Sequence, residues 1–248
     1  MANLVIDIGN TRTKIAAFEH DDLLYTSQYQ HVDVPIINGW LSDYTIGQVI
    51  ISSVKKDNEE WQKSLAATTP VSWFHASMTG NITNKYETPE TLGLDRLAAA
   101  IGAHDSFPGI DNMIIDAGTC ITYDFIDSNG NYFGGSISPG LNMRYKALNY
   151  YTAALPVIEA DKCFNDTYGK DTPSSMRSGV QNGIKFELTG FIGSYKKDGS
   201  DMNVILTGGD SIFFDTLLKN SIFAPCVKID PHLVLRGLNA VIQHYYVV

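Results

Sequence analysis

The sequence predicts an α/β protein with two domains built on the same plan. Short apolar runs of strand length alternate along the chain with longer segments of helical composition. An apolar run, an Asp-x-Gly turn and a second apolar run occur twice, around Asp7 and around Asp116. The chain has 248 residues, 44% of them hydrophobic, and can therefore bury a sizeable core. We expect an N-terminal domain at 1–109 and a C-terminal domain at 110–248.

The N-terminal half begins with a predicted hairpin. Residues 4–8 and 13–18 are apolar runs separated by Gly9-Asn10-Thr11, which predicts a strand, a tight turn and a second strand. A short β-branched run at 48–52 predicts a buried strand. The other predicted elements of this half are helices at 58–68 and 94–104 and a strand at 71–75, before the break at Phe107-Pro108-Gly109.

The C-terminal half repeats this pattern. The runs 113–115 and 121–126 predict two strands around the turn Asp116-Ala117-Gly118-Thr119. A third apolar run at 204–206 ends in Thr207-Gly208-Gly209-Asp210. Helices are predicted at 141–151, 175–195 and 231–246.

Charge and cysteine content exclude several classes of protein. The formal net charge is -9, from 27 acidic and 18 basic residues, which disfavours nucleic acids and anionic membranes as partners. The three cysteines form no CxxC pair, so we expect neither a disulfide framework nor a zinc site, and a reducing compartment. No run approaches the ~20 apolar residues of a membrane span, and the N-terminus has no signal-like run. We therefore expect a cytoplasmic protein.

The first Asp-x-Gly turn has the composition of a phosphate-binding hairpin. Its sequence is Asp7-Ile8-Gly9-Asn10-Thr11-Arg12-Thr13-Lys14. Gly9 permits close approach of a ligand to the backbone, and successive N–H groups in a turn can hold an anion. The Asp7 carboxylate would repel phosphate, which implies a cation between them, with Mg²⁺ held through water as the simplest choice. An ordinary Asx-stabilised hairpin turn explains this motif equally well.

Two further motifs extend the same interpretation. The turn Asp116-Ala117-Gly118-Thr119 would bind phosphate from the opposite side, and Gly208-Gly209 would leave room for a ribose or a flat ring. A simple strand-to-helix turn is the alternative for the Gly-Gly motif. Small residues occur in both predicted helices, at 94–104 and 231–246, and would allow two helices to approach each other closely. Routine core packing is the alternative explanation. The small residues are Ala98, Ala99, Gly102, Gly237 and Ala240.

Taken in order, these motifs resemble the actin/hexokinase/Hsp70 superfamily of ATPases. The resemblance implies two ribonuclease-H-like α/β domains with a nucleotide cleft between them. Other nucleotide-binding signatures are missing from the sequence, including GxxxxGK[ST], a GxGxxG after a strand, and the HRD and DFG motifs of protein kinases.

Finer motifs resemble the type III pantothenate kinases over nearly the whole chain. The matching segments are Asp-x-Gly-Asn-Thr at 7–11, Tyr86, Gly93-Leu94-Asp95-Arg96, Asp116-x-Gly118-Thr119, Gly134-Gly135-Ser136-Ile137-Ser138-Pro139-Gly140, and Asp171-Thr172 with Ser178-Gly179. Asp171 stands where the family pattern has asparagine, and Cys120 stands where alanine is common.

The resemblance implies roles for individual residues. Asp95 corresponds to the base that accepts the proton of the pantothenate hydroxyl, and its place at a helix start favours its ionised form. Residues Asp7, Ile8, Gly9, Asn10, Thr11, Arg12, Thr13, Lys14 and Thr119 correspond to ATP contacts. Tyr86, Gly93, Leu94, Asp95, Arg96 and Thr172 correspond to substrate contacts. Asp116 corresponds to a ligand of a monovalent cation, K⁺ or NH₄⁺.

Structural roles remain open for three of these residues. Asp95 can be a helix-start charge or an ion-pair partner of Arg96. Arg96 can bind the pantothenate carboxylate through a bidentate pair or form a structural salt bridge. Thr172 can simply cap the following helix.

The expected activity is phosphorylation of pantothenate by ATP, the first step toward coenzyme A. The resemblance also implies a homodimer with the pantothenate pocket at the subunit interface, where Thr172 would reach into the partner's pocket. Two alternatives stay open: another small-molecule kinase or phosphohydrolase of the superfamily, and a nucleotide-binding regulatory protein without turnover. Asp95 favours an enzyme, because a pure binder needs no base beside the acceptor.

Overall fold

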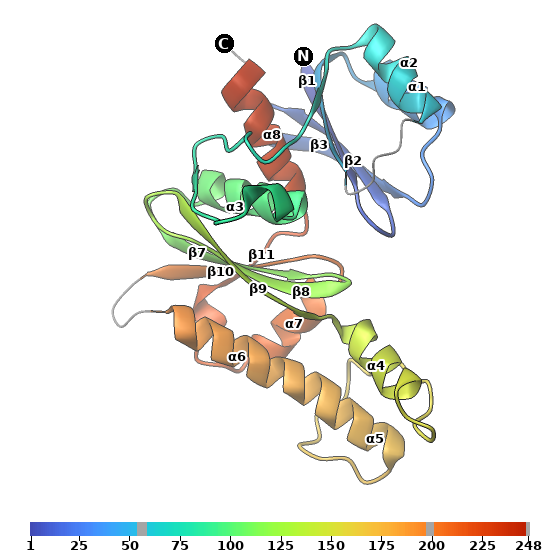
Figure 1. The fold of residues 1–248 in the computed structure, drawn as a ribbon, viewed down its shortest axis with the longest axis vertical. Helices are drawn as coiled ribbons and strands as arrows, with labels where there is room; N and C mark the ends of the chain where they lie inside the picture. The colour runs from blue at the N-terminus through green and yellow to red at the C-terminus, as the bar shows by residue number, and fades with distance from the viewer. Residues whose placement is uncertain (54–58, 197–200, 247–248) are drawn as a thin grey trace. The chain divides into compact units, whose positions relative to one another are not determined.

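The chain folds into two compact units, each containing a mixed β-sheet with helices (Figure 1). The computed structural model describes residues 1–53, 59–196 and 201–246. Unit 1 comprises Met1–Gly109, Asn129–Tyr132 and His232–Val248, and unit 2 comprises Ile110–Ser128 and Phe133–Pro231. These units differ from the predicted limits 1–109 and 110–248 in two segments, because 129–132 and the C-terminal helix pack with unit 1. Among the described residues, no helix has the length and apolar character needed to cross a bilayer.

Unit 1 is built on a five-stranded sheet of order β3-β2-β1-β4-β5. The strands are β1 (Ala2–Ile8), β2 (Thr13–Glu19), β3 (Asp22–Tyr29), β4 (Ile46–Ser53) and β5 (Val71–Trp73). The helices are α1 (Val34–Asp43), α2 (Glu60–Thr68), α3 (Leu94–Ser106) and α8 (Leu233–Tyr246). A 3₁₀ turn at Pro89–Thr91 precedes α3, and the two-residue strand β6 (Thr83–Asn84) pairs with Asn131 and Tyr132. The predicted helix at 58–68 is α2, and Asn58 itself lies outside the described residues.

Successive side chains of β1 point to opposite faces of the sheet, so the two faces bear different residues. Leu4, Ile6 and Ile8 pack with α1 and α2 in one buried cluster. The intervening residues point to the other face, where Asn3 donates a hydrogen bond to Asn239 of α8 at 2.9 Å. Asp7 shares that second face and lies at the carboxyl end of β1, on the side covered by α3 and α8.

Two glycines allow α3 and α8 to pack against each other (Figure 1). A Cβ atom on Gly237 would lie 1.8 Å from the Ala98 carbonyl oxygen, and one on Gly102 would lie 2.5 Å from that of Leu233. Any larger side chain at these positions would force the helices apart. The small residues that mark both helices therefore serve a close helix crossing.

Unit 2 repeats the strand plan of unit 1. Its sheet follows the order β11-β10-β7-β8-β9-β6, in which β9-β8-β7-β10-β11 corresponds to β3-β2-β1-β4-β5. The strands are β7 (Asp111–Ala117), β8 (Cys120–Ile126), β9 (Asn131–Pro139), β10 (Met202–Thr207) and β11 (Val227–Ile229). In both units an antiparallel hairpin is followed by a parallel strand beside its first member. The predicted duplication and the predicted α/β class are thus confirmed.

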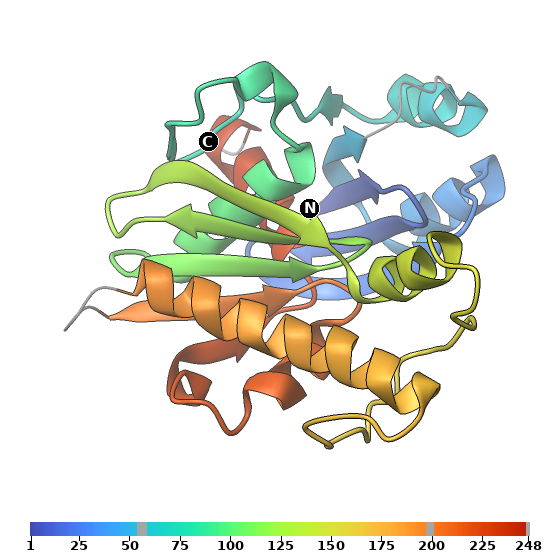
Figure 2. The ribbon, with the colours of Figure 1, turned by 60° about the horizontal axis from the view of Figure 1, so that its bottom comes forward.

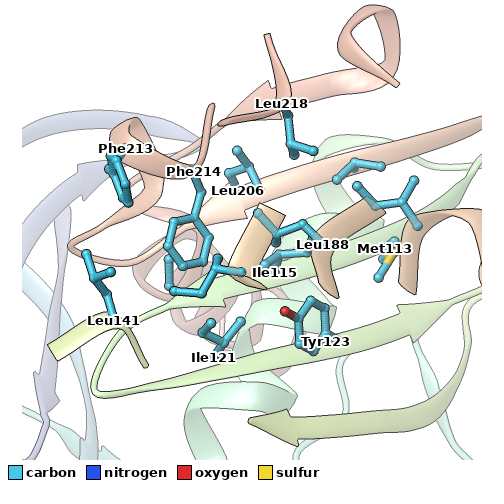
Figure 3. Packing of buried hydrophobic residues seen from close by; sticks show 14 of the residues in the cluster. Met113, Ile115, Ile121, Tyr123, Leu141, Leu188, Leu206, Phe213, Phe214 and Leu218 are labelled. Carbon is cyan, nitrogen blue, oxygen red and sulfur yellow. The ribbon is translucent and has the colours of Figure 1, made fainter. Parts of the chain in front are cut away.

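The core of unit 2 lies between the sheet and the helices α6 and α7 (Figures 2 and 3). The helices of this unit are α4 (Leu141–Tyr150), α5 (Thr172–Arg177), α6 (Gly183–Tyr195) and α7 (Ser211–Leu218), with a π-helical turn at Ser178–Asn182 and a 3₁₀ turn at Ala224–Cys226. Tyr123 of β8 is fully buried in this core and stacks on Phe191 with ring centroids 4.1 Å apart. Figure 3 shows the Tyr123 ring among the aliphatic side chains of β7, β8 and α6.

Candidate functional site

The first predicted phosphate turn is an exposed loop between β1 and β2. Gly9 closes it by donating its N–H to the Arg12 carbonyl oxygen at 3.2 Å. Asn10, Thr11 and Arg12 are exposed, whereas Ile8 and Thr13 are buried at the strand ends. The loop thus presents polar side chains and backbone to solvent on a rigid hairpin, as a phosphate site requires.

Asp7 is the electrostatically unusual residue of unit 1. Lys14 stands directly opposite it on β2, and Ser52 stands opposite it on β4. Burial raises the pKa of Asp7 to about 6, the Lys14 ammonium lowers it in part, the Asp95 carboxylate raises it, and a hydrogen bond with Ser52 lowers it. The structure therefore brings Asp7 and Asp95 together, although 88 positions separate them in the sequence.

Asp95 occupies the first turn of α3, after the N-cap Gly93. Its carboxylate is exposed, and Oδ1 accepts a hydrogen bond from the Arg96 backbone N–H at 2.8 Å. A Cβ atom on Gly93 would lie 2.6 Å from that same oxygen, so glycine is required for this arrangement. Leu94, between them, is partly buried.

Tyr86 and Arg96 contact each other beside the start of α3. Arg96 is buried, and its guanidinium carbon lies 5.6 Å from the centroid of the Tyr86 ring, within reach of a cation–π interaction. The Tyr86 N–H donates to Asn84 Oδ1 at 2.9 Å. Asn84 Nδ2 is buried and finds no partner among the described residues, which is unusual for a buried donor. Asn84 was not predicted from the sequence as a site residue. The sequence feature that could have indicated it is its position two residues before Tyr86.

The second motif, at 116–119, and the third motif, at 207–210, lie close together in unit 2. Asp116 lies near the end of β7, and the turn at Gly118 and Thr119 follows, with Thr119 exposed. Gly208 has a positive φ of 87°, and a Cβ atom there would lie 2.3 Å from Asp116 Oδ1. The Asp210 N–H donates to the Ala117 carbonyl oxygen at 2.9 Å. Only glycine allows the third motif to approach Asp116 this closely.

Thr172 begins α5 and lines a cavity of about 1170 Å³ within unit 2. Asp171 is the N-cap, since its side chain accepts a hydrogen bond from the Ser174 N–H at 2.8 Å. These hydrogen bonds hold the pKa of Asp171 below its usual range. The capping role considered for Thr172 is therefore wrong, and its exposed side chain is left for another contact.

Sequence reasoning also missed a hydrogen-bonded network at the edge of this cavity. Arg144 of α4 binds Glu187 of α6, with 2.6 Å between Arg144 Nη2 and Glu187 Oε2, and Tyr123 donates its hydroxyl to Glu187 Oε1 at 2.7 Å. One signal was available in the sequence. A cation in the first turn of a helix opposes the helix dipole, so Arg144 needs a compensating partner.

The arrangement of possible metal ligands limits how the protein could hold a cation. Among the residues that the structure describes, no group of three or more His, Cys, Asp or Glu side chains gathers at one place. A metal cage made wholly of protein ligands is thus missing from the described part of the chain. Mg²⁺ is often held by one or two carboxylates together with substrate phosphates, and Asp7 beside Asp95 suits that mode.

Comparison with known proteins points to one family. A sequence model described as type III pantothenate kinase matches residues 3–194. A Bacteroides fragilis protein named type III pantothenate kinase is 44% identical over 243 residues, covering 98% of each chain. A solved structure from Campylobacter jejuni, assigned to the Baf family of transcriptional activators, matches with a TM-score of 0.63 and 21% identity, covering 97% of each chain. The ROK hexokinase from Thermus thermophilus matches with a TM-score of 0.52 and 11% identity, covering 97% of this chain and 98% of that one. These two structural likenesses concern the fold, which is that of the actin-like ATPases and sugar kinases.

Proposed function

The chain belongs to the type III pantothenate kinase family, and we propose that Asp95, together with the residues around Asp7, carries out its phosphoryl transfer. The enzyme uses ATP to phosphorylate pantothenate to 4'-phosphopantothenate, the first step of coenzyme A biosynthesis. The single observation that supports the assignment of roles is that Asp95, in the first turn of α3, lies close enough to Asp7 for its charge to raise the pKa of Asp7.

Asp95 is proposed as the catalytic base for the pantothenate hydroxyl. Asp95 is exposed, so a substrate can reach it. The Arg96 N–H fixes one carboxylate oxygen, and the other, which accepts no hydrogen bond from the described residues, can accept a proton. Phosphoryl transfer has a loose transition state, in which orienting the attacking hydroxyl matters more than early proton removal. A carboxylate fixed at the start of a helix meets that need.

ATP is proposed to bind through residues 7–14 and Thr119. The Gly9 loop offers backbone and hydroxyl groups, and Lys14 adds a positive charge next to Asp7. Mg²⁺ held at Asp7, through water, would neutralise the charge on the phosphates. An added cation would also offset the repulsion between Asp7 and Asp95 that helps to keep the Asp7 pKa high.

Asp116 is proposed to bind a monovalent cation, K⁺ or NH₄⁺. Its carboxylate is partly buried and lies against the backbone of the Gly208 turn. That close fit supports a local site near the end of β7 in which an oxygen ligand holds a cation.

Tyr86, Gly93, Leu94, Arg96 and Thr172 are proposed as substrate contacts. The contact between Tyr86 and Arg96 supports a polar pocket beside α3, as does the buried Asn84 Nδ2, which has no hydrogen-bond partner in the described part of the chain. Thr172 belongs to unit 2 and lines a cavity with an exposed hydroxyl.

A homodimer with a shared pantothenate pocket is also proposed, along with a cytoplasmic location. Unit 2 exposes several large apolar side chains, which supports a protein interface on this unit. They include Tyr150, Tyr151, Tyr168 and Phe186.

The test of the activity is release of ADP by the purified protein. ADP should form only when pantothenate is present together with ATP, Mg²⁺ and K⁺, and the product should carry one added phosphoryl group by mass spectrometry. ATP consumption that does not depend on pantothenate would instead favour another activity of the superfamily. Nucleotide binding without any turnover would favour a regulatory protein.

A further inference from the structure

Asp210, at the end of the third motif, has a carboxylate with no structural partner. Asp210 occupies the N-cap position of α7. An aspartate at this position ordinarily accepts a hydrogen bond from a backbone N–H in the first turn of the helix. The Asp210 side chain makes no such bond, and no other side chain or backbone group in the described part of the chain donates to it. Its carboxylate is therefore left for a contact outside the fold.

The backbone of Asp210 is fixed beside the second phosphate turn. Its N–H donates to the Ala117 carbonyl oxygen at 2.9 Å, and its own carbonyl oxygen accepts from the Phe214 N–H at 2.9 Å. Ala117 directly precedes Gly118 and Thr119, the turn that is proposed to bind ATP. A ligand held at that turn would therefore lie next to Asp210, and both contacts belong to unit 2.

The space beside Asp210 is open to a ligand. A Cβ atom on Gly209 would have no other atom within 4 Å, so the backbone just before Asp210 borders free space. Asp210 itself is partly buried, and its oxygens are not among the fully buried atoms that lack a partner. A ligand can thus reach the carboxylate and the bare glycine backbone together.

The surroundings of the carboxylate favour a neutral ligand group that donates hydrogen bonds. Burial has removed part of the water around Asp210 and raises its pKa, which the exposed Lys162 ammonium lowers in part. A carboxylate that has lost hydration and has no donor gains from each O–H or N–H group that a ligand supplies. A phosphate group, which is anionic, would be repelled at this place.

The ribose is the part of ATP that matches these requirements. Its 2' and 3' hydroxyls are neutral donors, and the ribose directly follows the phosphates that the neighbouring turn is proposed to hold. The adenine amino group is also a donor, but it lies at the far end of the nucleoside from the phosphates. An acidic side chain that binds ribose hydroxyls is a recurrent solution in dinucleotide-binding folds.

We propose that Asp210 accepts hydrogen bonds from the ribose hydroxyls of ATP and thereby selects ribonucleotides over deoxyribonucleotides. This inference rests on the proposed function, in particular on the ATP contact of Thr119. Asp210 is a specificity-determining residue in this account, and phosphoryl transfer at Asp95 does not depend on it.

The test compares ATP with 2'-deoxy-ATP and 3'-deoxy-ATP as phosphoryl donors at saturating pantothenate. Wild type should prefer ATP in kcat/KM, and in Asp210→Ala this preference should fall about tenfold over at least one deoxy analogue. The loss should come from a higher KM for ATP, with kcat and the KM for pantothenate nearly unchanged. Asp210→Asn keeps one acceptor oxygen and should give an intermediate result. Asp215→Ala, at another partly buried aspartate of α7, is the control and should keep the wild-type preference.

Inosine triphosphate separates the ribose from the base, because it lacks the adenine amino group. The preference for ATP over inosine triphosphate should be the same in Asp210→Ala and in wild type, and a loss confined to this preference would overturn the assignment to the ribose. Ratios within one preparation do not depend on the fraction of folded enzyme, and Asp210→Asn replaces Asp210→Ala if the latter is insoluble. A wild-type enzyme that phosphorylates pantothenate but does not distinguish ATP from either deoxy analogue would overturn this inference alone. Failure to phosphorylate pantothenate with any nucleotide would overturn the proposed function itself.

Discussion

Replacing Asp7 by asparagine should stabilise the folded protein while lowering its Mg²⁺-dependent activity. Burial, opposed by Lys14 and reinforced by Asp95, raises the pKa of Asp7 from 3.8 to about 6. An acid whose pKa is higher in the folded state than in the unfolded state opposes folding once it is ionised. That destabilisation is absent below about pH 4, grows as the pH rises through about 6, and is constant above that range.

The magnitude follows from the difference between the two pKa values. A rise from 3.8 to about 6 corresponds to about 3 kcal/mol at pH 7.5 as an upper limit. Asp7 is partly exposed, and solvent screening reduces the expected effect to about 1–2 kcal/mol. At about pH 5 the effect should be about half as large, because the folded state then keeps Asp7 protonated. Asparagine keeps the shape of the side chain and removes the charge.

The assay is urea unfolding at about pH 5 and about pH 7.5, without Mg²⁺ or nucleotide. Asp43→Asn, at the exposed end of α1, is the matched control and should have little effect at either pH. A parallel Mg²⁺ titration of activity should show a higher Mg²⁺ requirement for Asp7→Asn. The reasoning fails if Asp7→Asn is no more stable than wild type at the higher pH, or if its advantage does not shrink at the lower one.

Three further predictions follow from the site and the core. Asp116→Ala should abolish the response of activity to K⁺ at fixed ionic strength, and identical K⁺ titrations for variant and wild type would refute the cation role. Gly237→Ala should destabilise unit 1 by more than about 2 kcal/mol because its Cβ meets a carbonyl group of α3, whereas Gly39→Ala, with open space around it, should be neutral or stabilising. Asp95→Asn and Thr172→Val chains should each be nearly inactive, yet mixed dimers should recover part of the activity. If mixed dimers form by mass and recover none, the shared pocket is wrong.

The duplicated plan of the fold was predictable because each half repeats the same local pattern. An apolar strand, an Asp-x-Gly turn and a second strand produced β1–β2 and β7–β8 at nearly the predicted positions. Local pattern does not reveal pairing between distant segments. The C-terminal helix was therefore placed with the second half of the chain, although α8 packs with α3 and β1.

Several elements escaped prediction for identifiable reasons. Strand β3 is an edge strand with a mostly exposed, irregular pattern of side chains. Helix α1 contains both Pro35 and Gly39, which suggest a loop, but Asp33 caps its start and proline is tolerated in a first helical turn. Strand β9 contains Gly134 and Gly135, and its close approach to Tyr123 of β8 is possible only because Gly135 has no side chain.

The candidate site was predictable where a motif is contiguous and hidden where it depends on tertiary contacts. Residues 7–14 and the segment from Gly93 to Arg96 could be proposed from the sequence by resemblance. The proximity of Asp7 to Asp95 and Ser52 depends on which face of the unit 1 sheet is covered by α3 and α8. The network of Arg144, Glu187 and Tyr123 joins three separate elements, and its one local signal, the cation in the first turn of α4, does not identify its partners.

The most direct test of the central claim is the turnover of Asp95→Asn. Its kcat for pantothenate should fall about 10²–10⁴-fold, because the amide keeps the shape of the side chain but cannot accept the proton. The Kd for ATP should stay close to the wild-type value, and Glu90→Gln, an exposed change shortly before α3, should leave both quantities unchanged. Turnover by Asp95→Asn above about a third of the wild-type rate would contradict the assignment of Asp95 as the base.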